Sequence, residues 1–235
     1  MEDPRPCSYL DGITASLEHL VLLDVGEMEL ERMLERGWRR FGPDYFRPAC
    51  PSCSQCVPTR IAAAEMTLSR SQRRARNRSA AFSVEIGRPR VDDERLALYA
   101  RWHADRERTR DWPASSLDAR TYALQFAFPH PAAREVVYRD QDSGRIVGVG
   151  LCDETPRSWS AAYFFYDPDY ARCSLGIANV ATLCDIAARA GKPHVYLGFH
   201  VAACPSLTYK GAFEPRETLR GWPAFDEEPV WVRAR

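Results

Sequence analysis

The order of apolar segments between residues 134 and 201 constrains the fold of this chain more than any other feature. Residues 134–140 (REVVYRD) and 143–155 (SGRIVGVGLCDET) are two strand-like runs joined by a turn sequence, and residues 158–170 (SWSAAYFFYDPDY) are a third, rich in aromatics. Residues 172–194 then place apolar side chains at helical spacing and end in Gly191, Lys192 and Pro193. Residues 194–201 (HVYLGFHV) predict one more strand.

This order is that of an acyltransferase core of the acetyltransferase type (GNAT-type), in which a mixed sheet splays apart to admit an acyl donor. The predicted fold class is α+β, with a GNAT-type mixed sheet and helices in the C-terminal part and a smaller cysteine-containing N-terminal region. A change of pattern near residue 90 predicts two domains, residues 1–90 and 91–235. Helices are also predicted at residues 26–42 and from Asp92, and a strand at residues 57–66.

The composition is that of an ordinary soluble globular protein. Hydrophobic residues make up 45% and charged residues 27% of the 235 residues, so the core needs no disulfides. The N-terminus has no basic segment followed by an apolar one, and no run reaches the roughly 18 apolar residues of a membrane helix. We therefore expect a cytoplasmic protein with no membrane partner, whose cysteines are thiols or metal ligands.

Three cysteines lie close together in the sequence. Cys50, Cys53 and Cys56 form a C-x2-C-x2-C run, and Cys7 is the best candidate for a fourth ligand. A zinc ribbon needs two separated knuckles, and a ferredoxin-type run needs a cysteine where this chain has Arg60. The run is therefore either a metal site completed by Cys7, or a group of small buried side chains under a proline-flanked turn.

Positive charge is concentrated in one segment although the formal net charge is zero. Residues 68–90 hold seven arginines and one acid, Glu85, whereas the whole chain has only two lysines, Lys192 and Lys210. Such a segment is usually a solvated face or a flexible connector. The alternative is a strip that binds phosphates, since a guanidinium group binds two phosphate oxygens at once.

Several motifs in one order resemble the aminoacyl-tRNA-protein transferases. These are YFRPACPSCSQCVPTRI (45–61), LSRSQRRARNR (68–78), YFFYDPDYARCSLG (163–176) and VYLGFHVAACPSLTYKGAFEPRETL (195–219). The resemblance covers roughly residues 7 to 220 and is strongest to the bacterial aspartate/glutamate leucyltransferases. The chain departs from the family pattern at His200, Ser206 and Thr208, and these changes bear on which amino acid is transferred.

The resemblance implies a tRNA-dependent aminoacyltransferase that forms a peptide bond. Leucine would pass from leucyl-tRNA to the α-amine of proteins that begin with Asp or Glu, which marks them for degradation in the N-degron pathway. An arginyl donor acting on the same acidic N-termini is the alternative within the family. No cofactor is required for this chemistry because the donor ester is already activated.

The residue types at the motifs suggest roles in this reaction. Asp167 would orient the amine or remove its proton, or else form only a helix-capping turn. Tyr209 and Lys210 would stabilise the oxyanion or contact the terminal ribose and phosphate, or else form an ordinary strand end. The resemblance implies tRNA binding by the arginine strip: Arg70, Arg73, Arg74, Arg76 and Arg78. The acidic side chain of the acceptor would be bound by Arg60, Arg73 or Arg74.

In the related arginyltransferases the N-terminal cysteines are associated with an iron–sulfur cluster, so the resemblance implies either such a cluster or zinc at Cys7, Cys50, Cys53 and Cys56. Cys204 lies in the last motif and fits a core position equally well.

Two functions of other classes compete with the transferase interpretation. A CoA-dependent N-acetyltransferase would share the fold, but ARCSLGIANVA lacks the glycine-rich pyrophosphate loop. A nonenzymatic zinc nucleic-acid-binding module would leave the C-terminal half without a purpose.

Overall fold

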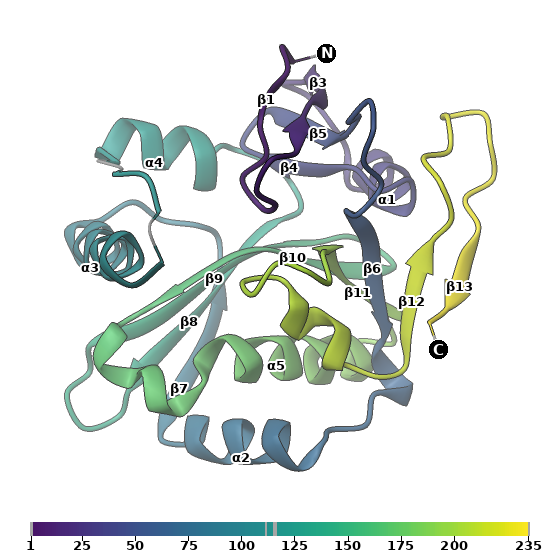
Figure 1. The fold of residues 1–235 in the computed structure, drawn as a ribbon. Coiled ribbons are helices and arrows are strands. Elements are labelled where there is room, and N and C mark those ends of the chain that lie inside the picture. Colours follow the sequence, from purple (N-terminus) through teal and green to yellow (C-terminus); the bar gives the residue numbers. More distant parts are fainter. Residues whose placement is uncertain (1, 111, 115–116, 235) are drawn as a thin grey trace.

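An eight-stranded sheet crosses the whole molecule (Figure 1). The structure is a computed structural model, and it describes residues 2–110, 112–114 and 117–234. The strand order is β13-β12-β6-β11-β10-β9-β8-β7, and β10 and β11 are parallel whereas the other neighbours are antiparallel. The strands are β6 (Val57–Ala62), β7 (Phe82–Gly87), β8 (Ala133–Asp140), β9 (Ile146–Glu154), β10 (Ser158–Tyr166), β11 (His194–His200), β12 (Arg216–Leu219) and β13 (Trp231–Arg233).

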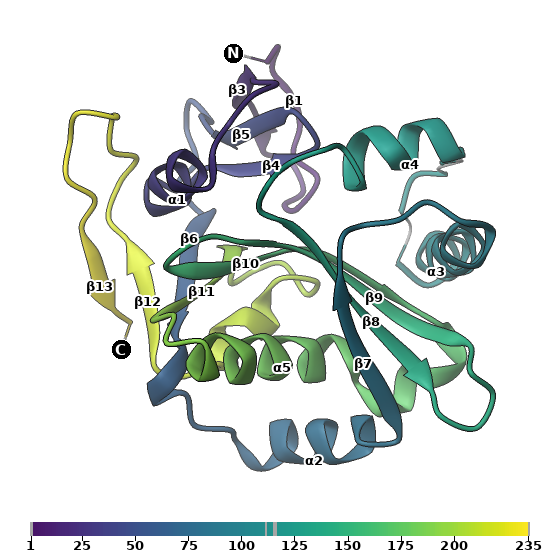
Figure 2. The ribbon, with the colours of Figure 1, turned by 180° about the vertical axis from the view of Figure 1, so that it is seen from behind.

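Helices cover both faces of this sheet (Figures 1 and 2). α2 (Arg70–Ser79) and α5 (Leu175–Arg189) lie on one face, and α3 (Asp93–Arg110) and α4 (Ala119–Phe126) lie on the other. Because both faces are covered, β9 is buried along nearly its whole length, which explains its continuous apolar sequence. Among the described residues no helix is long and apolar enough to cross a membrane.

The N-terminal region is a small layer above one end of the sheet. It contains β1 (Arg5–Pro6), β2 (Thr14–Ala15), α1 (Glu27–Glu35) and a three-stranded sheet of β3 (Leu17–Val21), β5 (Asp44–Pro48) and β4 (Arg39–Phe41). Trp38 and Tyr45 from this region share a buried cluster with Tyr196 of β11. The N-terminal layer therefore packs directly on the strand that begins the last motif.

The arginine-rich segment forms a helix and an edge strand. The Ser69 hydroxyl accepts a hydrogen bond from the Gln72 backbone, and the Gln72 side chain accepts one from the Ser69 backbone, which caps α2. Only Gln72, Ala75 and Ser79 of α2 are buried, on the side that faces α5. α2 is therefore an amphipathic helix whose arginines point outward.

The fold class predicted from the sequence is confirmed, as are the strands and the long helix between residues 134 and 201. The helix predicted over residues 26–42 is shorter, because Gly37 adopts a left-handed conformation (φ +82°) and the chain then enters β4. The strand predicted over residues 57–66 ends at Ala62, where the 3₁₀ helix η1 (Ala63–Glu65) begins. β6 and β7 precede residue 90, so the sheet draws strands from both sides of the predicted domain boundary.

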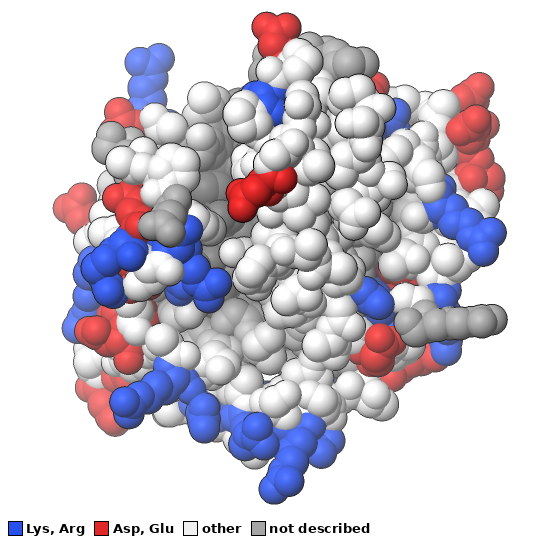
Figure 3. Space-filling view, in the orientation of Figure 1, with Lys and Arg blue, Asp and Glu red and all other residues white. Residues whose placement is uncertain are grey.

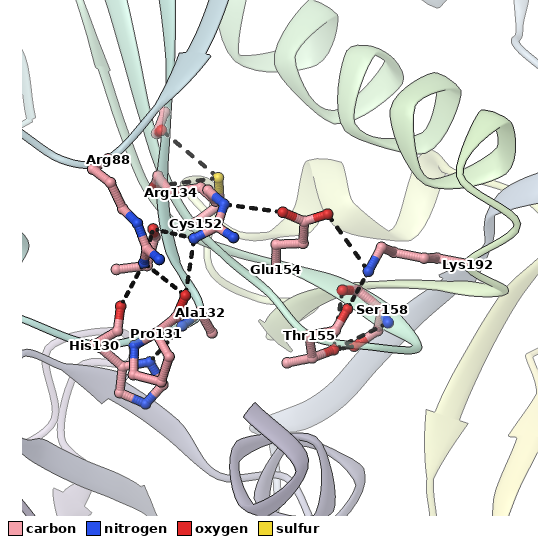
Figure 4. Close-up of polar contacts among 12 residues, drawn as sticks. Arg88, His130, Pro131, Ala132, Arg134, Cys152, Glu154, Thr155, Ser158 and Lys192 are labelled. Carbon is pink, nitrogen blue, oxygen red and sulfur yellow. Dashed lines mark hydrogen bonds and ion pairs between the residues drawn. The ribbon is translucent and has the colours of Figure 1, made fainter. Parts of the chain in front are cut away.

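Polar contacts fix the end of the sheet at which β10 and β11 pair (Figure 4). Lys192, just before β11, donates to the backbone oxygen of Thr155 and lies 3.5 Å from a carboxylate oxygen of Glu154. The other Glu154 oxygen accepts from Arg134 Nε at 2.9 Å. The hydroxyls of Thr155 and Ser158 are 2.8 Å apart at the start of β10. These contacts anchor the first residues of both parallel strands.

Candidate active site

β10 and β11 separate after only a short stretch of pairing. Ser158–Ser160 pair with His194–Tyr196, and beyond these residues β10 pairs only with β9, and β11 only with β6. Each strand has an irregular register where they part, between Ala161 and Tyr163 in β10 and between Tyr196 and Gly198 in β11. We call the separated strand ends, residues 161–166 and 197–200, the fork. This is the splayed arrangement expected for an acyl-donor site.

Arg39 of β4 reaches the base of the fork. Its guanidinium donates to the Ser160 hydroxyl at 2.8 Å and to the backbone oxygen of Ala161. Gly198 has φ +76°, and a Cβ there would lie 3.2 Å from Arg39 Nε, so glycine leaves the space that the guanidinium occupies. Arg39 is 8% exposed and forms no ion pair among the described residues. Burial lowers the pKa of Arg39 to about 10, so the group stays protonated at neutral pH.

Lys210 lies in the 3₁₀ helix η3 (Thr208–Ala212), which packs against β11. Its Nζ donates to the Phe199 backbone oxygen at 3.0 Å, within the fork. Burial, and then the charge of Arg39, lower the pKa of Lys210 to about 7. The neutral form of Lys210 is therefore accessible near neutral pH, and a neutral amine can accept a proton.

The other two residues expected to be catalytic lie in different surroundings. Tyr209, next to Lys210, is 36% exposed. Asp167 directly follows β10 and is 2% exposed. One of its oxygens lies 2.6 Å from Arg101 and 3.5 Å from Arg145, and the other accepts from the Asp169 backbone at 3.2 Å. The Asp167 carboxylate thus caps the 3₁₀ helix η2 (Pro168–Cys173), and both of its oxygens are occupied.

The expected metal ligands gather in one region near Lys210. Burial, and then the thiols of Cys50, Cys7, Cys53 and Cys204, raise the pKa of Cys56 to about 12. The Cys50 thiol donates to the Ser16 backbone oxygen at 3.6 Å, and Cys7 Sγ accepts from the Tyr9 backbone at 3.4 Å. In the described part of the chain, no three His, Cys, Asp or Glu side chains are arranged to hold a metal ion. The sulfur donors suit zinc or an iron–sulfur cluster, but their arrangement does not fit one.

The arginines expected to bind tRNA are exposed on α2, and Figure 3 shows basic side chains along the edge where Figure 1 draws this helix. Arg76 lies 3.9 Å from Asp185, and Arg70, Arg73, Arg74 and Arg78 have no ion-pair partner among the described residues. Arg60 differs from them. It lies 2.7 Å from Glu217, and its guanidinium stacks over the Trp231 ring at 4.4 Å.

Sequence reasoning did not single out Arg39, the residue at the base of the fork. The available signal was GWRRFG (37–42), where two arginines interrupt an apolar strand-like segment after a helix. Arginine is seldom buried without a carboxylate partner, so its position in such a strand suggests a special role. The contact with Ser160, 121 residues away, requires the tertiary fold.

Comparison with known proteins gives consistent matches along the chain. The family model described as "Arginine-tRNA-protein transferase, N terminus" matches residues 5–74, and the one described as "Arginine-tRNA-protein transferase, C terminus" matches residues 94–220. The chain is 30% identical to an aspartate/glutamate leucyltransferase of Campylobacter jejuni, over 97% of this chain and 95% of that protein. Identity to the aspartate/glutamate leucyltransferase of Halorhodospira halophila is 35%, over 93% of each. Among solved structures, FemX has a TM-score of 0.47 and 9% identity, over 78% of this chain and 63% of that chain.

Proposed function

Because this chain belongs to the arginine-tRNA-protein transferase family and is an aminoacyl-tRNA-dependent transferase, we propose that it moves leucine from leucyl-tRNA to the α-amine of proteins that begin with Asp or Glu. The observation that carries this proposal is the similarity to aspartate/glutamate leucyltransferases over nearly the full length of both chains. The reaction would take place in the cytoplasm, where charged tRNA is available.

We propose that the reaction takes place at the fork and that Lys210 is its general base. The acceptor amine attacks the carbonyl carbon of the aminoacyl ester, a C–N bond forms, and the amine nitrogen gives a proton to neutral Lys210 Nζ. The C–O bond to the tRNA ribose then breaks, and the ribose oxygen takes a proton back from the Lys210 ammonium. Lys210 suits this role better than Asp167, since both Asp167 oxygens already accept hydrogen bonds or ion pairs.

The remaining residues of the fork position the reactants. Arg39 provides a fixed positive charge at the base of the fork, where it favours neutral Lys210. Tyr209 is adjacent to Lys210 in η3, and burial raises the pKa of its hydroxyl, so the hydroxyl stays protonated and would donate to the oxyanion or to the terminal ribose. Since the donor ester is already activated, placing the amine and the ester together supplies most of the acceleration. No step uses a metal.

The arginine face of α2 is proposed to bind the tRNA backbone. Four of its five arginines lack an ion-pair partner among the described residues, so a phosphate would not have to displace a carboxylate from them. Guanidinium groups along one helix face suit the regularly spaced phosphates of an RNA strand. The sequence also proposed Arg73 and Arg74, as well as Arg60, for the acidic acceptor side chain. Arg60 is the weakest candidate of the three, because Glu217 already neutralises its charge.

A transfer assay tests the proposed function. Purified protein is mixed with tRNA charged with radiolabelled leucine or arginine, and with peptides that begin with Asp, Glu, Lys or Ala. We expect leucine to move to the Asp and Glu peptides only. Lys210→Met should reduce the transfer rate by roughly 100-fold or more with little change in tRNA affinity, as expected for loss of a general base.

An arginyl donor is the second candidate, because both matching family models carry the arginine name. Transfer of labelled arginine, and not leucine, to the acidic peptides would establish it. No transfer from either donor would contradict the assignment of this reaction to the chain.

A further inference from the structure

Arg216 and His200 form a pair beside Lys210. Arg216 begins β12 and His200 ends β11, and Arg216 Nη1 lies 3.3 Å from His200 Nδ1. A guanidinium can only donate, so the imidazole accepts and is neutral. Burial, and then the charges of Arg216 and Lys210, lower the pKa of His200, in agreement with a neutral ring. His200 therefore orients the guanidinium without adding a charge.

The backbone one residue after Lys210 lies directly on this pair. A Cβ at Gly211 would be 2.8 Å from His200 Nε2 and 3.3 Å from Arg216 Nη1. Such a distance to His200 is shorter than side chains tolerate, so glycine permits the close approach. The guanidinium of Arg216 thus lies against the 3₁₀ turn that carries Lys210, and the charges of both residues act on His200.

The charge of Arg216 is uncompensated. Among the described residues its guanidinium makes no ion pair, and its only hydrogen bond is the one to His200. Its Nε is buried and has no hydrogen-bond partner. Of the carboxylates next to it in the chain, Glu217 pairs with Arg60, and Glu214 accepts a hydrogen bond from the Arg216 backbone and not from the side chain. A buried donor without a partner calls for a ligand.

Arg60, on the neighbouring strand β6, shows what a compensated arginine in this sheet looks like. Its Nε lies 2.7 Å from Glu217, its Nη1 is 3.3 Å from the Tyr196 hydroxyl, and its guanidinium stacks on Trp231. The charge of that guanidinium is neutralised by Glu217, and both its Nε and its Nη1 have hydrogen-bond partners. The free donors of Arg216 are therefore a particular feature of this position rather than a general property of arginines here.

We propose, on the basis of the function above, that Arg216 binds the side-chain carboxylate of the acceptor's first residue, and that His200 is the positioning residue for this contact. A guanidinium with two free N–H groups suits a carboxylate bound through both oxygens. Asp and Glu carry that carboxylate one or two methylene groups from the α-carbon. The α-amine of the same residue can then reach Lys210 while its carboxylate reaches Arg216.

The same guanidinium chemistry would also suit a terminal phosphate of the tRNA. The acceptor is the better match because its carboxylate and its reacting amine belong to one residue, and the Arg216 guanidinium lies against the turn that carries Lys210. A phosphate is separated from the reacting ester by the ribose. An acceptor carboxylate and a tRNA phosphate at Arg216 would give different kinetic effects, which the experiment distinguishes.

The test compares wild type, Arg216→Gln, Arg216→Lys and the control Arg220→Gln, an exposed arginine just after β12. Steady-state transfer is measured with peptides that begin with Asp or with its neutral isostere Asn. We expect Arg216→Gln to raise KM for the Asp peptide about 10- to 100-fold, as for loss of a charge-assisted hydrogen bond, and to reduce the preference for Asp over Asn equally. Arg216→Lys should recover part of that preference, and tRNA affinity should not change.

An unchanged Asp-to-Asn preference in Arg216→Gln would overturn the proposal. Weaker tRNA binding with every acceptor affected equally would overturn it as well, in favour of a phosphate ligand. Binding of a fluorescent Asp peptide, measured by anisotropy without tRNA, separates this inference from the proposed function. Peptide binding that is lost in Arg216→Gln supports the site even if no transfer occurs, whereas absence of binding to the wild type refutes it. Thermal unfolding checks that each variant is folded.

Discussion

Arg39 is a buried cation whose hydrogen bonds go to neutral groups, the Ser160 hydroxyl and the Ala161 carbonyl. Burying a charge without a counterion costs free energy, and proteins keep such groups mainly where they serve a purpose. Here the charge acts on Lys210, whose pKa is lowered first by burial and then by Arg39. Other charged and titratable groups near Lys210 are Cys204 and Cys56, which raise its pKa, and the neighbouring His200.

The first prediction concerns Arg39→Gln, measured as kcat against pH with both substrates saturating. Neutral Lys210 is the active base, so the rate should rise with pH and be half-maximal at a pH of about 7 in the wild type. Removing the charge of Arg39 favours the ammonium form and raises the pKa of Lys210. The rising limb should then move to higher pH. Arg39→Lys keeps the charge and should leave the limb near its original pH, and an unmoved limb in Arg39→Gln would contradict this coupling.

At this scale the sequence identified Lys210 but not the reason for its reactivity. Lys210 stood out as one of two lysines in an arginine-rich chain, and its motif resembled that of a known family. Its pKa depends on Arg39, which is 171 residues earlier, and on burial against β11. Neither a distant charge nor burial leaves a periodic pattern in the sequence.

At the scale of elements, α2 shows how a charged segment can be folded. The high density of arginines indicated a solvated face, a flexible connector or a phosphate-binding strip. Three buried residues at three- to four-residue spacing form the narrow face of α2 that packs on α5: Gln72, Ala75 and Ser79. These are not strongly apolar residues, so the hydrophobic period that usually marks a helix is weak here. The Ser69 and Gln72 capping pair was the better signal.

The second prediction is that Arg73→Ala/Arg74→Ala weakens tRNA binding. Two lost phosphate contacts should lower the slope of log affinity against log salt concentration by about two, so the defect is largest at low salt. Filter binding over a salt series measures this. The double variant Arg157→Ala/Arg220→Ala, with two exposed arginines outside α2, is the control. Equal slopes for wild type and the α2 variant would remove α2 from the tRNA site.

Over the whole molecule, the fold joins parts of the chain that the sequence pattern separated. β6 lies between β11 and β12, and β7 is the edge strand next to β8, although both precede residue 90. The long helix α3 begins at Asp93, close to this change of pattern. Strand neighbours far apart in sequence cannot be predicted from local periodicity, whereas the consecutive strands β8, β9 and β10 can.

The third prediction follows from this topology. A fragment of residues 91–235 lacks β6, so β11 and β12 lose their shared neighbour, and the fragment should not fold. Its amide NMR spectrum should lack the dispersion of the full chain. The full chain should unfold in one urea transition, because both parts share one sheet. A well-dispersed spectrum for the fragment would show that the C-terminal part folds independently.

Aminoacyl transfer at the fork is tested most directly by a crystal structure with a hydrolysis-resistant aminoacyl-adenosine amide, a mimic of the charged 3′ end of tRNA. We expect the aminoacyl carbonyl to lie between the open edge of β10 and Lys210, with Arg39 beneath it and space for an acceptor toward Arg216. An aminoacyl group bound on the α3 and α4 face, away from Lys210, would show that transfer does not take place at the fork.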